Sequence, residues 1–361
     1  MLSHAGKMLW RRDNVPEIDF GHAKELPPWS IPVILLNILI LIPILLIINY
    51  TFEKVFPVIA IVEDEKPPAY DPLPVEPLPT GANPPKPSNA PAPAPAPIVG
   101  EGRPVTSSFR ATWRLLRSHG GFRALFRGLP CLFAQHLVRA FLGLLLFNFV
   151  PLAFLFGNLI GSLALVQFST AWVHIVITPH SPLRFWRRLP AFKSTFRATW
   201  KPTLLFWAAT EAANWGSVGI AYLLQVPTDG QAADASSIWR AVVSVVAILL
   251  LQIMVLIPAY VILIRIQASL LPDEHETIIP FDRSFNGRIE PAIVGGLGYA
   301  TISDAWSSFS KSAWRRIVIL HVKITAVSLA VLMALAVLVV PQFILLASAA
   351  KDAGNSDNGG M

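Results

Sequence analysis

The chain has 361 residues, of which 53% are hydrophobic and 14% charged, and its mean hydropathy is +0.54. This composition excludes an ordinary soluble domain and predicts a multi-pass integral membrane protein. The net charge of +7 is carried mostly by residues that flank apolar segments, so we expect the lipid bilayer as partner and no nucleic acid. A single cysteine, Cys131, excludes a disulfide framework and a multi-cysteine zinc site. The chain has no motif of a nucleotide-binding or hydrolytic enzyme, so we expect no enzyme activity, cofactor or metal.

Residues 1–28 form a polar N-terminal tail of mixed charge that lacks the hydrophobic core of a secretory signal. The segment 29–56 follows and contains the first predicted transmembrane helix. Its apolar run from Trp29 to Tyr50 is long enough to cross a hydrocarbon core of ~30 Å at ~1.5 Å per residue. We expect Pro43 to be tolerated as a kink.

Residues 64–100 are rich in proline, which denies the backbone the hydrogen bonds of helices and sheets. This segment is predicted to be a disordered or polyproline linker. It serves either as a spacer or as the ligand of a protein partner with a proline-binding domain. The spacer is favoured because no basic residue stands beside a clear PxxP core.

Residues 104–349 are predicted to form a membrane bundle with five further transmembrane helices, and 350–361 a polar C-terminal tail. The five apolar segments are 130–156, 159–178, 203–226, 238–264 and 317–346. Before the first of them, Arg110, Arg114 and Arg117 recur at helical spacing with apolar residues between them. This pattern predicts an amphipathic helix on the membrane surface, which the glycine pair at 120–121 would end.

The distribution of charge sets the predicted topology. The loops that follow the first predicted transmembrane helix, 29–56, and the apolar segments 159–178 and 238–264 contain nine, six and six Lys or Arg residues. They are therefore expected on one side of the membrane. Three units then follow one another, each with an odd helix, a basic loop and an even helix. The fold class predicted is therefore all-α, with six transmembrane helices in a pseudo-threefold bundle and amphipathic surface helices. Such internal repetition usually frames a central site at mid-depth.

An aromatic residue next to a cation precedes or opens each even-numbered predicted helix, namely 130–156, 203–226 and 317–346. This arrangement is typical of the membrane interface. These predicted lipid or interface residues are Phe126, Arg127, Gly128, Trp200, Lys201, Trp314 and Arg315.

Ionisable and polar residues also lie within the even segments, at depths of roughly 10 to 21 Å. They are His136, Arg139, Glu211, Asn214, His321 and Lys323. One hypothesis is a central cavity in which Arg139 and Lys323 attract an anionic solute. The alternative, which is the ordinary way such charges are tolerated, is an ion pair between Arg139 and Glu211 that fixes helix register.

Two stretches resemble motifs of the mitochondrial carrier family. Residues 120–128, GGFRALFRG, are similar to its pattern of glycine, aromatic, base and glycine, although Gly120 replaces an acid. Pro258, Arg265 and Gln267 are similar to the signature that ends its odd helices. The resemblance implies three repeats around a solute path, a mitochondrial membrane, and binding of an anionic lipid such as cardiolipin near the glycine motif.

The gate residues of that family are replaced in this chain. Tyr260 and Leu263 stand at the acidic and basic positions of the signature, and Ile59 and Ser181 stand at the acidic positions of the other repeats. A transporter that breaks and re-forms ion pairs needs those charges. Two functions therefore remain: a carrier-like transporter of a small, perhaps anionic, solute, or a non-transporting membrane adaptor or insertion factor like degenerate relatives of the family.

Overall fold

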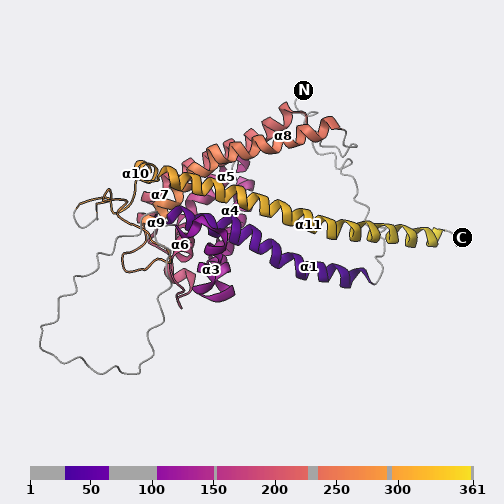
Figure 1. Cartoon of the computed structure of the whole chain (residues 1–361), viewed down its shortest axis with the longest axis horizontal. Coiled ribbons are helices and arrows are strands. Elements are labelled where there is room, and N and C mark those ends of the chain that lie inside the picture. The colour runs from indigo at the N-terminus through magenta and orange to yellow at the C-terminus, as the bar shows by residue number, and fades with distance from the viewer. Residues whose placement is uncertain (1–28, 65–103, 150–152, 227–234, 291–294, 359–361) are drawn as a thin grey trace, which may run out of the picture. The chain divides into compact units, whose positions relative to one another are not determined.

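The computed structural model describes residues 29–64, 104–149, 153–226, 235–290 and 295–358, which are mostly helical and contain no strand (Figure 1). The predicted tail 1–28 and nearly all of the proline-rich linker lie outside these ranges. The helices are α1 Ser30–Leu46, η2 Ile47–Val55, α2 Phe56–Val62, η3 Val105–Ser107, α3 Phe109–Ser118, η4 Gly121–Phe126, α4 Leu129–Phe149, α5 Ala153–Ala164, α6 Val166–Ile177, η5 Phe185–Arg188, α7 Phe192–Leu223, α8 Ala235–Leu251, η6 Gln252–Leu256, α9 Ile257–Ser269, α10 Ile302–Ser307 and α11 Lys311–Asn358.

Several helices are long and apolar enough to cross a membrane, as expected of a multi-pass integral membrane protein. Four such spans run over Ser30–Val62, Gly121–Leu146, Ser236–Ser269 and Lys311–Leu345. The bent pair α5 and α6 adds a fifth if it counts as one span. The fourth predicted span, 203–226, lies on α7 but is not among them, because polar residues such as Glu211 and Asn214 interrupt its apolar run. The six-span arrangement is therefore not confirmed.

The predicted span 159–178 is not one straight helix. It breaks at Leu165, where the backbone leaves helical geometry at φ −106° and ψ 21°, and the axes of α5 and α6 differ by 63°. Leu165 and Val166 are both buried, so α6 follows the packing of the core and departs from the direction of α5.

Two of the odd spans share a local irregularity. The π-helix η2 leads into α2 with Pro57 near its start, and the π-helix η6 leads into α9 with Pro258 near its start. Proline has no N–H to donate within the preceding turn, and a π-helical turn absorbs the resulting mismatch. The remaining odd span, 159–178, has a break at Leu165 instead of a π-helix followed by proline. The structural repeat is therefore only partial.

The predicted amphipathic helix is present as α3. Leu116 and Thr112 are buried, whereas Arg110, Arg114 and Arg117 are exposed, so the charged and packed faces separate as predicted. The helix ends at Ser118, and the following Gly120 and Gly121 both have positive φ.

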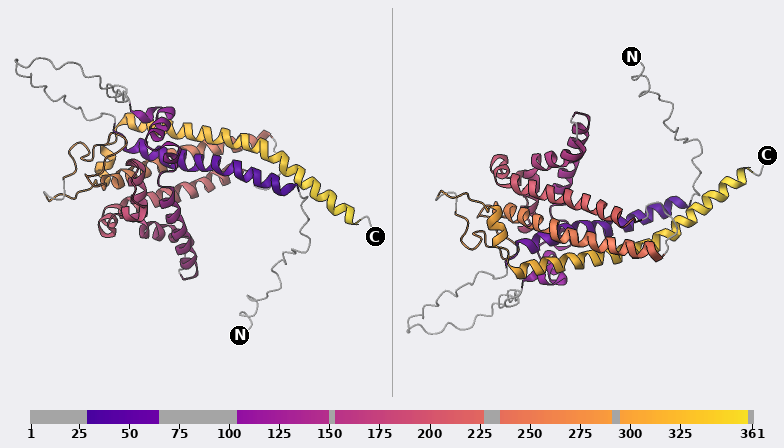
Figure 2. Two further views of the ribbon diagram at one scale, coloured as in Figure 1. Left: turned by 90° about the horizontal axis from the view of Figure 1, so that it is seen from below. Right: turned by 90° about the horizontal axis from the view of Figure 1, so that it is seen from above.

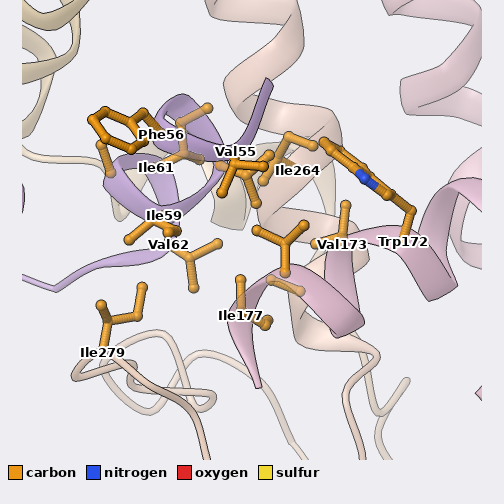
Figure 3. Close-up of a cluster of buried hydrophobic side chains, with 14 of the residues drawn as sticks. Val55, Phe56, Ile59, Ile61, Val62, Trp172, Val173, Ile177, Ile264 and Ile279 are labelled. Atoms are coloured by element: carbon orange, nitrogen blue, oxygen red, sulfur yellow. The ribbon is translucent and has the colours of Figure 1, made fainter. Parts of the chain in front are cut away.

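The chain divides into two compact units, and the larger one comprises residues 45–326. Its core joins α2, α6 and α9, and Figure 3 shows Val55, Ile59, Val173, Ile177 and Ile264 pointing toward one another. Every residue from Val55 to Val62 is buried, and Glu63, which follows them, is only 2% exposed. Burial of these apolar side chains is the main force that orders this unit.

The smaller unit comprises residues 1–44 and 327–361, of which α1 and the distal part of α11 are described. Figure 2 shows these two helices alongside each other. Asn37 donates a hydrogen bond from Nδ2 to Oε1 of Gln342, the kind of polar contact that joins helices within a bilayer. Large apolar side chains such as Leu39 and Val337 are exposed, as expected for residues that face lipid.

Candidate functional site

The larger unit contains a cavity of about 330 Å³ that is lined by η2, α4, α5, α6, α7 and α9. Four of the six residues predicted to bind a solute line it: His136, Arg139, Glu211 and Asn214. These four predicted residues therefore share one cavity. His136 and Asn214 are exposed, so the cavity is not sealed around them.

Arg139 is held in the cavity by α5. Its Nη2 donates to the Oγ of Ser162 at 3.0 Å, and its Nε is buried without a hydrogen-bond partner. Gly161 lies against this side chain, since a Cβ at Gly161 would be 3.5 Å from the Cγ of Arg139, an ordinary van der Waals contact. Ser162 and Gly161 were not predicted as site residues, although both lie in a polar interruption of an apolar segment.

The helix α7 contributes Trp207, Glu211 and Asn214, whose spacing of four and three residues places them on one helix face. In the part of the chain that the structure describes, Glu211 makes no ion pair with Arg139. The predicted alternative of a register-fixing pair is therefore wrong, because Arg139 is directed toward Ser162. The indole Nε1 of Trp207 is buried and has no hydrogen-bond partner.

Gln267 of α9 completes the cavity wall and is only 1% exposed. Its Nε2 donates to the Oγ of Ser169 at 2.7 Å, and its backbone oxygen lies 2.9 Å from Nε2 of His174. Its side-chain oxygen Oε1 is buried without a partner. Gln267 was predicted as part of a gate-like remnant and not as a cavity residue. Lys54 and Trp207, which also line the cavity, were not predicted as site residues.

The other gate-like residues have structural contacts. Pro258 lies at the start of α9, after the π-helix. The guanidinium carbon of Arg265 lies 4.6 Å from the ring centre of Phe285 and 5.3 Å from that of Phe309, where a cation–π interaction is favourable. Its two terminal nitrogens donate to the backbone oxygen of Ile61 at 3.3 Å and to the Oγ of Ser308 at 3.1 Å. Among the described residues Arg265 has no ion-pair partner.

His321 and Lys323 do not join the cavity, so the prediction of three even helices around one site is wrong for α11. Nδ1 of His321 lies 2.9 Å from the backbone oxygen of Ile317 in its own helix. Lys323 lines a separate pocket of about 470 Å³ with Arg315 and Thr106. Neither residue lines the cavity, because α11 contributes no residue to its wall.

Arg127 and Gly128 pack the turn between η4 and α4 against the core, whereas they were predicted to lie at the membrane interface. Arg127 is 8% exposed, and its Nη1 donates to the backbone oxygens of Val176 at 3.3 Å and Thr178 at 3.0 Å, at the end of α6. Gly128 has φ +79°, and a Cβ there would lie 2.9 Å from Cδ1 of Trp172. The aromatic, base and glycine pattern here reflects packing and helix capping.

The remaining interface residues lie nearer the surface. Lys201 and Trp200 are exposed, with Nζ 5.5 Å from the ring centre, as an interfacial anchor requires. Trp314 packs against Trp306 and Phe309, whereas the adjacent Arg315 is exposed.

A third pocket, of about 430 Å³, lies between the start of α4 and the loop before α7. Phe126 lines it, together with a group of basic residues: His119, Arg123, Arg127, His180, Arg184 and Arg188. Nη2 of Arg188 donates to the Oγ1 of Thr178 at 2.7 Å, and burial lowers the pKa of this guanidinium. We refer to this group as the basic pocket. Its composition suits an anion.

Comparison with known proteins adds no assignment. No family model, curated protein or solved structure matches this chain. Within the described ranges, no group of three or more His, Cys, Asp or Glu side chains is placed to hold a metal ion. The geometry of the cavity is therefore the basis for assigning a function.

Proposed function

We propose that the chain is a carrier-like membrane transporter of a small solute that bears an anionic group, built on a six-helix, pseudo-threefold plan. The observation that carries the proposal is the cavity in which the Nε of Arg139 and the indole Nε1 of Trp207 are buried without partners. Buried polar atoms are costly when unsatisfied, and a solute that accepts hydrogen bonds would satisfy both.

The size and composition of the cavity support a small solute. About 330 Å³ lies near the lower end of the ~300 to 1,000 Å³ typical of ligand sites. Arg139 and Lys54 are the cationic side chains that line it, and a guanidinium suits the planar oxygens of an anionic group.

A thermal-shift screen tests this function. The purified protein in detergent would be heated with a panel of carboxylates, phosphates and nucleotides, because a ligand of the folded state raises the melting temperature. We expect a shift with one anionic class that is lost in Arg139→Gln and kept in Arg197→Gln, which removes an exposed guanidinium of α7 outside the cavity. No shift from any compound would reject the transporter.

The alternative function is a non-transporting adaptor or insertion factor, and one observation favours it. The end of α2 is fixed by buried contacts: Nη2 of Arg316 donates to the backbone oxygens of Ala60 at 3.1 Å and Glu63 at 2.8 Å. Alternating access requires contacts that break and re-form, so a rigid closure here suits a protein that does not transport. Uptake of the stabilising solute into proteoliposomes decides between the two, since an adaptor would show none.

We also propose that the basic pocket binds an anionic lipid, such as cardiolipin in a mitochondrial membrane. Cardiolipin should raise the melting temperature more than phosphatidylcholine, and the double variant Arg123→Gln, Arg184→Gln should lose that difference because both residues line the pocket. Equal effects of the two lipids would reject this partner.

A further inference from the structure

The cavity contains a guanidinium and a carboxylate that are not paired with each other. Arg139 and Glu211 both line it, yet Arg139 donates to Ser162, and within the described residues Glu211 makes neither an ion pair nor a hydrogen bond. Glu211 is half-buried on α7. Opposite charges within a membrane protein usually pair, because an isolated charge is costly in a medium of low dielectric constant.

Two charges that share a cavity without pairing are complementary to a solute that carries both signs. The carboxylate of such a solute would bind the guanidinium of Arg139, and its ammonium group would bind the carboxylate of Glu211. A solute with a negative charge alone would leave Glu211 unpaired and would be repelled by it. The arrangement therefore favours a dipolar solute over a simple anion.

The other unsatisfied atoms of the cavity have the matching polarity. The Nε1 of Trp207 can donate a hydrogen bond to a carboxylate oxygen. The Oε1 of Gln267 can accept one from an ammonium group, and this side chain is 1% exposed. The cavity thus offers donors for one end of a zwitterion and acceptors for the other.

We infer that the cavity binds a free amino acid, with its carboxylate at Arg139 and its ammonium group at Glu211. This inference rests on the proposed transport function and narrows its solute class. The volume of about 330 Å³ limits the solute to a single small molecule of this kind.

The test compares matched triplets of compounds on the unmodified protein: alanine with lactate and ethylamine, and phenylalanine with 3-phenyllactate and phenethylamine. Within a triplet the side chain is constant, and either the ammonium group or the carboxylate is absent. Equilibrium binding and thermal shift would be measured in nanodiscs. We expect at least one amino acid to bind roughly tenfold or more tightly than its hydroxy acid and its amine, because each lacks one charge-assisted contact.

Two variants assign the contacts. Glu211→Gln should abolish the preference for the amino acid over the hydroxy acid, and Arg139→Gln should weaken both, whereas Arg197→Gln should change neither. Hydroxy acids that bind as tightly as amino acids would overturn this inference and leave the transport proposal in place. No binding of any compound in either triplet, or in the wider anion screen, would reject both. Because the triplet comparison uses the unmodified chain, it decides the inference even if a variant fails to fold.

Discussion

Arg316 and Glu63 form a buried ion pair, with Nη1 of Arg316 3.7 Å from Oε2 of Glu63 and side-chain exposures of 7% and 1%. Glu63 also accepts a hydrogen bond from the backbone N–H of Thr106 at 3.0 Å. The pair therefore joins the end of α2, the start of α11 and the segment that re-enters after the proline-rich linker. A contact among three segments this far apart in sequence orders the larger unit.

Replacing Glu63 by alanine should lower the free energy of unfolding by about 3 to 5 kcal/mol, because it removes one partner of a buried ion pair and the acceptor of the Thr106 N–H. Denaturant unfolding in detergent measures this loss. Glu53→Ala, at an exposed position of η2, is the matched control and should change stability little. Equal effects of the two variants would contradict a structural role for the pair.

Gly128→Ala should be destabilising by roughly 1 to 3 kcal/mol, since alanine disfavours φ +79° and its Cβ would meet the ring of Trp172 at 2.9 Å. Gly219→Ala on α7 is the control, because a Cβ there meets nothing within 4 Å. In a helix that substitution should be neutral or stabilising. The melting temperatures of the two variants are compared. An unchanged melting temperature in Gly128→Ala would show that the turn between η4 and α4 is loosely packed.

Gly161 should control solute binding without contacting the solute. Alanine fits at the 3.5 Å separation from Arg139 and should leave binding near normal, whereas leucine should displace the guanidinium. The loss of one charged hydrogen bond predicts a binding constant weaker by roughly tenfold or more in Gly161→Leu. Titration of the solute found in the screen measures it. Unchanged binding in a folded Gly161→Leu variant would argue against Arg139 as the anion site.

Asp64 should make the protein less stable as the pH rises. Burial raises the pKa of its carboxyl above the ordinary value, although a hydrogen bond from the backbone N–H of Asp282 and the nearby Arg265 act in the opposite direction. A carboxyl with a raised folded-state pKa stabilises the fold at low pH, and this contribution is lost as pH rises through that pKa. Asp64→Asn should therefore be more stable than the parent near neutral pH, and the advantage should shrink toward about pH 4. Unfolding measured across this range checks the slope.

Asp282 should show the opposite dependence. Burial alone would raise its pKa, but hydrogen bonds from the Ser284 side chain and from the backbone of Asn286 and Ser284 outweigh it, so the pKa is lowered. Its contribution is present above the ordinary pKa and is lost as pH falls through the folded-state value. Asp282→Asn should be less stable than the parent near neutral pH, with the deficit shrinking in acid. Parallel pH profiles for the two variants would contradict both assignments.

Local pattern predicted much of the helical structure. The basic and apolar spacing of α3 and its end before Gly120 follow from residues within one or two turns of each other, so sequence alone was sufficient. The same local reasoning misread Arg127, because an aromatic, a base and a glycine occur both at lipid interfaces and at tightly packed helix joins. Only the position of Thr178, fifty-one residues away, shows which of the two applies here.

The sequence by itself determined the helical membrane class and the depth of each polar residue along its helix, since both depend on hydrophobic runs and a constant rise per residue. The tertiary structure alone decided which of these residues share a cavity. It brought Arg139 and Glu211 together without pairing them, added Trp207 and Gln267, and directed Lys323 into another pocket. The physical reason is that depth fixes one coordinate of a side chain, whereas the rotation of its helix is set by packing against neighbours distant in sequence.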